Sequence, residues 1–188
     1  GTMTVGRDEI ASETIFTVSA GTFNNNSGTL TFVSQRHDTS DTYTIDVPTS
    51  LTLNNVIISS NDTGGSYEDT IAVAAGDTIT VAGNFTQTLG MVGGNWELQG
   101  NITIASGATG GTGTITLNGS GDQTYTYSSS GATAKLVVNK TTGSVSPAIG
   151  TTGLTVKVFS LTAGTFTAPS GTMTVGRDEI ASETIFTV

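Results

Sequence analysis

The sequence predicts an all-β fold, and within that class a β-solenoid, on three observations. About one residue in five is Thr, and Val, Ile and Tyr add side chains that are branched at Cβ or aromatic and suit a pleated strand. The 25 Gly residues allow frequent tight turns. A short strand pattern also recurs about every 21 residues, which fits one coil of two or three short strands with their corners.

The longest repeat in the chain is free of substitutions. Residues 1–18 read GTMTVGRDEIASETIFTV, and residues 171–188 read the same. Such an identity does not arise by chance at this composition, so residues 1–170 form one complete tandem repeat and residues 171–188 begin the next. The strand expected at the repeat junction comprises Thr2, Met3, Thr4 and Val5, and in the second copy Thr172, Met173, Thr174 and Val175.

A shorter pattern lies inside the long repeat: a small or polar residue, an apolar residue, Thr, and a second apolar residue. Its first apolar positions lie 17 to 28 residues apart and are Met3, Leu30, Leu51, Ile79, Trp96, Ile115, Leu136, Leu154 and Met173. Alternate residues of a strand point to opposite faces. We therefore expect these anchors to stack in one interior column, in about eight coils per repeat, with the intervening Thr residues facing outward.

Further strands are expected between the anchors, where they would supply the other sides of each coil. They span residues 14–18, 42–47, 56–59, 71–74, 101–105, 123–127 and 159–162. Clusters of Gly and Asn between them predict corners. Residues 7–15 form the one helix-like stretch, which is too short to be stable alone, and we interpret it as a loop or a single helical turn.

The competing architecture is a tandem string of β-sandwich modules. It predicts a Pro- or Gly-marked linker at each module boundary and one dominant cluster of buried aromatic residues. The only plausible joint is at residues 168–171, and the short period runs straight across it. The pattern therefore favours the solenoid.

Charge and composition exclude several classes of protein. The formal net charge is −9, and only six Lys and Arg are present, so nucleic acid is not an expected partner, because phosphate binding needs clustered cations. No run approaches the roughly 20 apolar residues of a membrane-spanning helix. The absence of Cys excludes disulfides and thiolate metal sites.

The sequence offers little chemistry beyond this. His37, the only histidine, lies beside Asp38 and near Asp41, and we interpret this segment as a solvated loop rather than an acid–base or metal site. No catalytic, cofactor-binding or metal-ligating residue is predicted, because the carboxylates are spread over two coils. The aromatic residues Trp96, Phe23, Phe85, Phe159 and Phe166 are expected in the core rather than on an exposed carbohydrate-binding platform. Six Asn-x-Ser/Thr sequons are candidate glycosylation sites: Asn25, Asn61, Asn84, Asn101, Asn118 and Asn139.

Several Thr- and Gly-rich phrases resemble the tandem repeats of giant bacterial surface proteins, which are adhesin-like or filamentous-haemagglutinin-like chains. The phrases are GTLTF at 28–32, GDTITVAGNFT at 76–86, GTITLNGSGDQTYTY at 113–127, KLVVNKTTGSV at 135–145 and FSLTAGTFTAPSGTMTV at 159–175. The resemblance implies an extracellular, elongated, right-handed β-helix used for adhesion, spacing or filament formation. It brings no catalytic motif.

Three functions follow as hypotheses. The leading one is a structural repeat of an extracellular filament or surface adhesin stalk, which continues end to end into identical repeats, either in one covalent chain or between separate chains. The alternative is a glycan- or surface-binding adhesin module that uses loops 35–41 and 61–69. A carbohydrate-active β-helix enzyme is the third and least favoured, and we expect that the chain is not an enzyme.

Overall fold

A computed structural model describes residues 1–8, 12–35, 39–60, 67–176 and 186–188. The described residues form a β structure without a helix, which confirms the predicted all-β class. The strands are β1 (Thr2–Asp8), β2 (Glu13–Thr17), β3 (Thr29–Gln35), β4 (Thr42–Asp46), β5 (Ser50–Leu53), β6 (Asn55–Ser60), β7 (Thr70–Val73), β8 (Thr78–Val81), β9 (Phe85–Gly93), β10 (Asn95–Leu98), β11 (Ile102–Leu117), β12 (Gln123–Tyr127), β13 (Ala132–Pro147), β14 (Leu154–Val156), β15 (Phe159–Phe166), β16 (Met173–Val175) and β17 (Phe186–Thr187).

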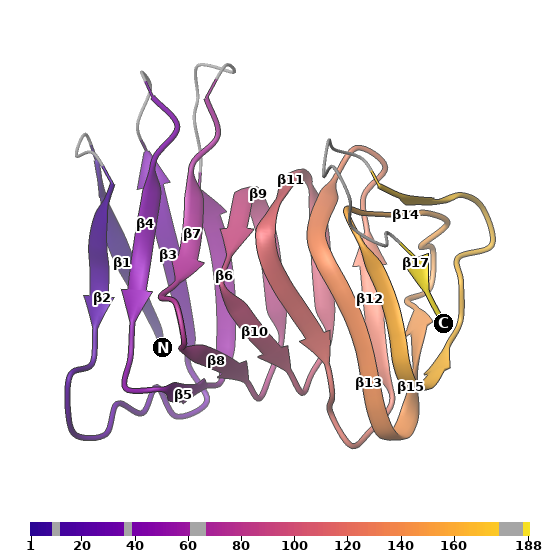
Figure 1. Cartoon of the computed structure of the whole chain (residues 1–188), viewed down its shortest axis with the longest axis horizontal. Coiled ribbons are helices and arrows are strands. Elements are labelled where there is room, and N and C mark those ends of the chain that lie inside the picture. Colours follow the sequence, from indigo (N-terminus) through magenta and orange to yellow (C-terminus); the bar gives the residue numbers. More distant parts are fainter. Residues whose placement is uncertain (9–11, 36–38, 61–66, 177–185) are drawn as a thin grey trace.

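The strands follow one another along the long axis of the molecule, with β1 and β2 at one end and β15 and β17 at the other (Figure 1). Every strand pairing in the described part of the chain is parallel. Parallel neighbours need a connection that returns to the same end of the sheet, so successive segments of the chain cannot be simple hairpins.

The pairings sort the strands into three rows. Row A contains β1, β3, β6, the first part of β9, the first part of β11, β12 and the last parts of β13 and β15. Row B contains β2, β4, β7, the last part of β9, the middle of β11, the first part of β13, β14 and β16. Row C contains β5, β8, β10, the last part of β11, the middle of β13, the first part of β15 and β17.

The chain visits the rows in the fixed order A, B, C and then A again. The described residues place eight strand segments in row A, eight in row B and seven in row C, because no strand follows β2 in row C before the chain returns to row A at β3. The long strands β9, β11, β13 and β15 bend and take part in more than one row.

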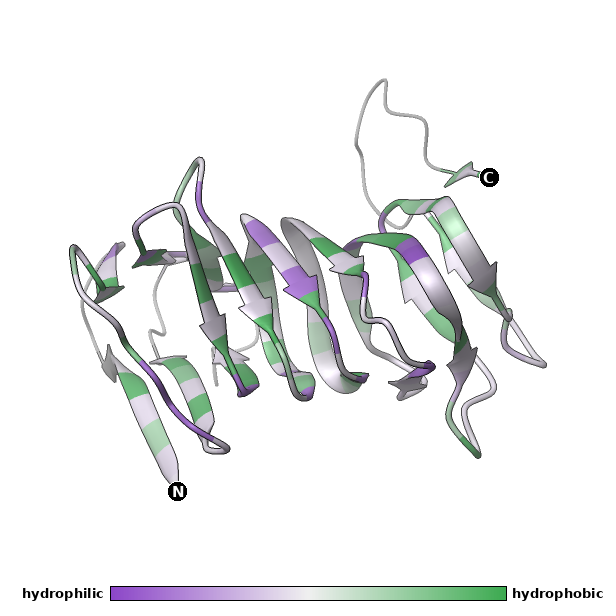
Figure 2. Cartoon of the chain, turned by 90° about the horizontal axis from the view of Figure 1, so that it is seen from below, coloured by the Kyte–Doolittle hydropathy of each residue, from purple (hydrophilic) through white to green (hydrophobic). Residues whose placement is uncertain are grey.

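The core consists of inward side chains that lie over one another along each row. In row A, Leu30, Val56, Phe85, Ile102 and Tyr125 are successive partners, and all are buried. Hydrophobic and polar bands alternate along the strands, as the period-2 pattern predicts (Figure 2). Trp96 and Phe85 lie in this core with ring centroids 5.4 Å apart, which confirms the expected burial of Trp96.

The prediction of a single anchor column is wrong. Met3 and Leu30 are partners in row A, but the anchors from Leu51 to Leu136 belong to row C, and Leu154 and Met173 belong to row B. Leu30 instead pairs with Val56, since the chain turns a corner directly after β5. All three rows use the same alternating pattern, so the pattern alone does not reveal the row.

The strands predicted between the anchors agree more closely with the structure. Each strand expected between the anchors is present and begins within one residue of its predicted start, although β11 and β15 run well past their predicted ends. The segment 7–15, interpreted as a loop or helical turn, is partly strand, because β1 extends to Asp8 and β2 begins at Glu13; residues 9–11 lie outside the described residues.

Corner side chains accept hydrogen bonds from backbone amide groups 23 to 29 residues further along the chain. Asn25 Oδ1 accepts from the amide of Asn54 at 2.8 Å, and Asn55 Oδ1 accepts from the amide of Asn84 at 2.9 Å. Asn101 Oδ1 repeats the contact with the amide of Thr124 at 2.8 Å. These bonds satisfy amide groups that leave the strand ladder at the corner.

We expect Gly94→Ala to destabilise the fold by at least about 2 kcal/mol, because the backbone conformation there disfavours other residues and the new methyl group has no room. Gly94 has a φ of +72°, and a Cβ added to it would lie 2.3 Å from the carbonyl oxygen of Val73. Chemical denaturation measures the change. Gly121→Ala is the matched control, since its Cβ would meet nothing within 4 Å. Equal stability of the two variants would contradict the corner geometry.

Candidate assembly interface

The two copies of the junction segment lie at opposite ends of the molecule. Thr2, Met3, Thr4 and Val5 all belong to β1, whereas in the second copy Thr172 directly precedes β16 and Met173, Thr174 and Val175 form it. The same sequence is therefore seen in two settings, once at an open end of the sheet and once behind an earlier strand.

The second copy shows how the junction segment docks onto the strand before it. β16 pairs with β14, with Leu154 beside Met173, Thr155 beside Thr174 and Val156 beside Val175. The amide of Leu154 donates to the carbonyl of Thr172 at 3.0 Å, and the amide of Gly176 donates to the carbonyl of Val156 at 3.1 Å. A continuous parallel ladder thus crosses the boundary between the two repeats.

A second contact crosses the same boundary further along the segment. β17 pairs with the start of β15, with Phe159 beside Phe186 and Ser160 beside Thr187. The rings of Phe159 and Phe186 stack with centroids 5.6 Å apart and planes 25° from parallel. Both strands of the second copy are therefore held by the preceding repeat.

In the first copy the corresponding edge is open. Among the described residues β1 pairs with β3 alone, and β2 pairs with β4 alone. Met3 is 47 % exposed, although its position in the pattern is an inward one, and Val5 and Ile15 are half-buried. A groove of about 400 Å³ runs between β1 and β2, lined by Met3, Thr4, Val5, Gly6, Glu13, Thr14 and Ile15. The edge combines unpaired backbone groups with uncovered apolar side chains.

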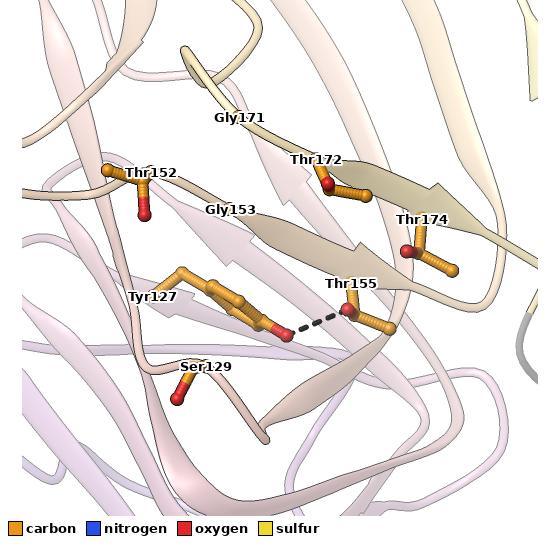
Figure 3. Close-up of a pocket in the computed structure, with 8 residues that line it drawn as sticks. All are labelled: Tyr127, Ser129, Thr152, Gly153, Thr155, Gly171, Thr172 and Thr174. Carbon is orange, nitrogen blue, oxygen red and sulfur yellow. Dashed lines mark hydrogen bonds between the residues drawn. The ribbon is translucent and has the colours of Figure 1, made fainter.

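A shallow cleft of about 420 Å³ lies at the junction beside β14 and β16 (Figure 3). The hydroxyl groups of Tyr127 and Thr155 are hydrogen-bonded at 2.8 Å, and Thr152, Thr172, Thr174 and Ser129 add further hydroxyls to its wall. The backbone of Gly153 and Gly171 completes the lining. No carboxylate, amine or imidazole lines this cleft, so the described wall offers hydrogen bonding but no acid–base pair.

Two aspartates lie at the corner between rows A and B. Asp41 Oδ1 accepts from the amide and the hydroxyl of Ser12, both at 2.9 Å, and Asp41 Oδ2 accepts from the hydroxyl of Thr39 at 2.6 Å. Asp69 Oδ1 accepts from the amide of Asp41 at 3.0 Å, while the buried Asp69 Oδ2 has no hydrogen-bond partner among the described residues. Within the described ranges no three acidic, His or Cys side chains converge as metal ligands. The contacts of Asp41 with Ser12 and Asp69 resemble those of the Asn corners and link segments that lie 28 or 29 residues apart in the chain.

The remaining residues singled out from the sequence lie mostly away from the junction. His37 and Asp38 fall outside the described residues, as does most of the loop at 61–69. Asn61 is likewise not described. Among the other sequons, Asn84, Asn101 and Asn139 are exposed and Asn25 and Asn118 are half-buried. Glycosylation stays a prediction.

Lys140 is a buried polar feature that the sequence analysis missed. Its side chain is only 2 % exposed, and Nζ donates to the carbonyls of Gly119 at 2.5 Å and Gly121 at 2.7 Å and to Gln123 Oε1 at 2.8 Å. Burial lowers the pKa of the Lys140 amine, and the nearby Asp122 carboxylate partly opposes this effect. All three ammonium hydrogens have acceptors inside the fold, so the group closes a corner rather than facing a ligand.

Gln123 and Gln87 play related parts in the interior. Gln123 Nε2 donates to the carbonyls of Leu98 at 2.9 Å and Gly100 at 2.5 Å. Gln87 Nε2 donates to the carbonyl of Gly90 at 2.7 Å, and its Oε1 accepts from the hydroxyl of Thr133 at 2.9 Å. The one signal in the sequence that could have identified these residues is a polar residue at a position that the alternating pattern assigns to the interior.

Comparison of the chain with protein families, with curated proteins and with solved structures found no match. In the described part of the chain no helix could span a bilayer.

We expect Lys140→Met to lower the free energy of unfolding by about 2–4 kcal/mol, because three acceptors, two of them buried, lose their donor while the side-chain volume is kept. Lys135→Met is the control, since Lys135 lies half-buried on the neighbouring strand segment, and it should change stability by less than about 0.5 kcal/mol. Urea denaturation of both variants measures the change in the free energy of unfolding. A Lys140→Met protein as stable as the control would show that the corner does not need the amine.

We expect the free energy of unfolding to fall at alkaline pH because of Tyr125. Burial raises the pKa of its hydroxyl from 10.0 to about 12, and this hydroxyl donates to the carbonyl of Thr167 at 3.1 Å. A raised folded-state pKa stabilises the fold fully below pH 10, and the contribution is lost as the pH rises from about 10 to about 12. A rise in pKa from 10.0 to about 12 corresponds to about 3 kcal/mol, and solvent screening at the partly buried hydroxyl reduces the expected loss to about 2 kcal/mol. Denaturation at several pH values should show it in the parent chain and not in Tyr125→Phe; parallel curves for the two would refute it.

Proposed function

We propose that this chain is one repeat of a β-solenoid, and that the repeat is a structural unit of a long extracellular filament or surface adhesin stalk. The rows A, B and C are then the three sides of each coil, and the buried side chains of the rows fill its interior. The function is mechanical, because continuous ladders and stacked apolar side chains make a stiff rod whose length scales with the number of repeats.

The parallel pairing supports the solenoid over tandem β-sandwich modules. Sandwich domains are built from antiparallel sheets with Greek-key connections. Here the pairings are parallel, the chain passes through the rows in cyclic order, and the ladder continues across the repeat boundary from β14 to β16. At about 4.8 Å per strand spacing, the seven coils and one further side of a repeat advance roughly 35 Å.

The observation that carries the proposal is the open edge of β1 set beside the covered edge of β16. β1 pairs with the later strand β3 and has no described partner on its other edge, where Met3 is 47 % exposed, whereas β16 has the earlier strand β14 as its partner on that edge. Long chains of identical repeats remove this open edge at every internal junction. The extracellular location rests on the likeness of the Thr- and Gly-rich phrases to bacterial surface repeats.

A chain of several repeats should appear in electron micrographs as a thread of uniform width. Asp at the positions of Met173 and Val175 in every repeat should break the thread into separate beads, because two charges would be placed where apolar side chains meet at the junction. Asp at the position of Thr174 is the control, since that side chain is exposed, and it should leave the thread intact. A parent chain that itself forms beads on a string would refute the proposal.

A further inference from the structure

The two copies of the junction segment occupy different rows. β1 lies in row A, but β16, which has the same sequence, lies in row B. The next strand shifts in the same direction, since β2 lies in row B and β17, which repeats its last residues, lies in row C. Two independent pairings therefore agree on a displacement of one row per repeat.

The displacement follows from the number of strand segments in a repeat. From β1 the chain makes seven passes through the rows, the first without a row C strand between β2 and β3, and reaches row A again at the end of β15, where Phe166 pairs with Val145. The junction segment then follows in row B rather than at the start of a new pass. One repeat of 170 residues thus contains seven coils and one side.

We propose that the open edge of β1 and β2 is the docking surface for the β14 and β15 end of another copy of this repeat, and that every junction turns the repeat by one side of the coil. This inference rests on the proposed function. Leu154 and Val156 of the preceding copy lie beside Met3 and Val5, in the register seen for β16. Row B of one repeat continues as row A of the next, row C as row B, and row A as row C.

The rotation gives the filament a period longer than its sequence repeat. Three sides around one axis make each turn about 120°, so three repeats restore the starting orientation after 22 coils, or roughly 105 Å. The corner between rows A and B, which carries the connections from β3 to β4 and from β6 to β7, then faces three directions in succession. A filament built this way presents these connections all around its circumference rather than along one face.

Labelling a multi-repeat chain tests the rotation. Ile149 is fully exposed in the turn between β13 and β14, and the chain has no Cys, so Ile149→Cys accepts one gold-tagged maleimide per repeat. In micrographs of six tandem repeats the labels should advance around the thread and return to the same edge at every third repeat. A uniform thread with all labels in one line, roughly 35 Å apart, would overturn the rotation alone. Beads on a string would overturn the proposed function as well.

Disulfide trapping tests the register in the present chain. Thr155→Cys with Thr174→Cys should form a disulfide, because these residues are direct partners of neighbouring parallel strands and their Cα atoms lie within bridging range. Thr165→Cys with Thr174→Cys is the control pair, since Thr165 pairs with Ser144 in row A and is not a partner of β16, and it should stay reduced. Trapping of the second pair, or of neither, would overturn the proposed register.

Discussion

In-register parallel pairing is the constraint on which the rest of this structure depends. Once strands pair in this way, each inward side chain lies directly over another, and the choice of residue at one level limits the next. Leu30, Val56 and Phe85 illustrate this in row A, and Ile79, Trp96 and Ile115 in row C. The same constraint makes every corner recur at the same place, so corner residues must satisfy backbone groups repeatedly.

The buried polar side chains are explained by those corners. Lys140, Gln123 and Gln87 donate to backbone carbonyls, the side-chain oxygens of Gln123 and Gln87 accept from Lys140 and Thr133, and the buried hydroxyls of Ser34 and Ser60 pair at 2.9 Å. A buried polar group without partners would destabilise the fold, whereas a satisfied one rigidifies it. The depressed pKa of Lys140 is thus a by-product of structural burial rather than a sign of catalysis.

A stack of parallel strands can be extended by a further strand at its open edge, and this property links the fold to its proposed assembly. Soluble proteins usually protect sheet edges with charges, Pro or covering segments. The segment from Thr2 to Val5 contains neither a charge nor Pro, and its apolar side chains are partly uncovered. The covered copy at β16 shows what protects such an edge within the chain, namely the preceding repeat. In a repeat protein of this kind much of the stability resides in interfaces between neighbours.

Alternation and Cβ branching are local properties of the chain, and they were sufficient to predict the all-β class and nearly every strand. They did not predict which strand stacks on which. Leu51 carries the same pattern as Leu30, yet the corner directly after β5 places it in another row. These local properties also did not predict the open groove at β1 or the burial of Lys140. These features depend on where the chain turns in three dimensions and on which distant segments then become neighbours, and a linear pattern of residues does not record either.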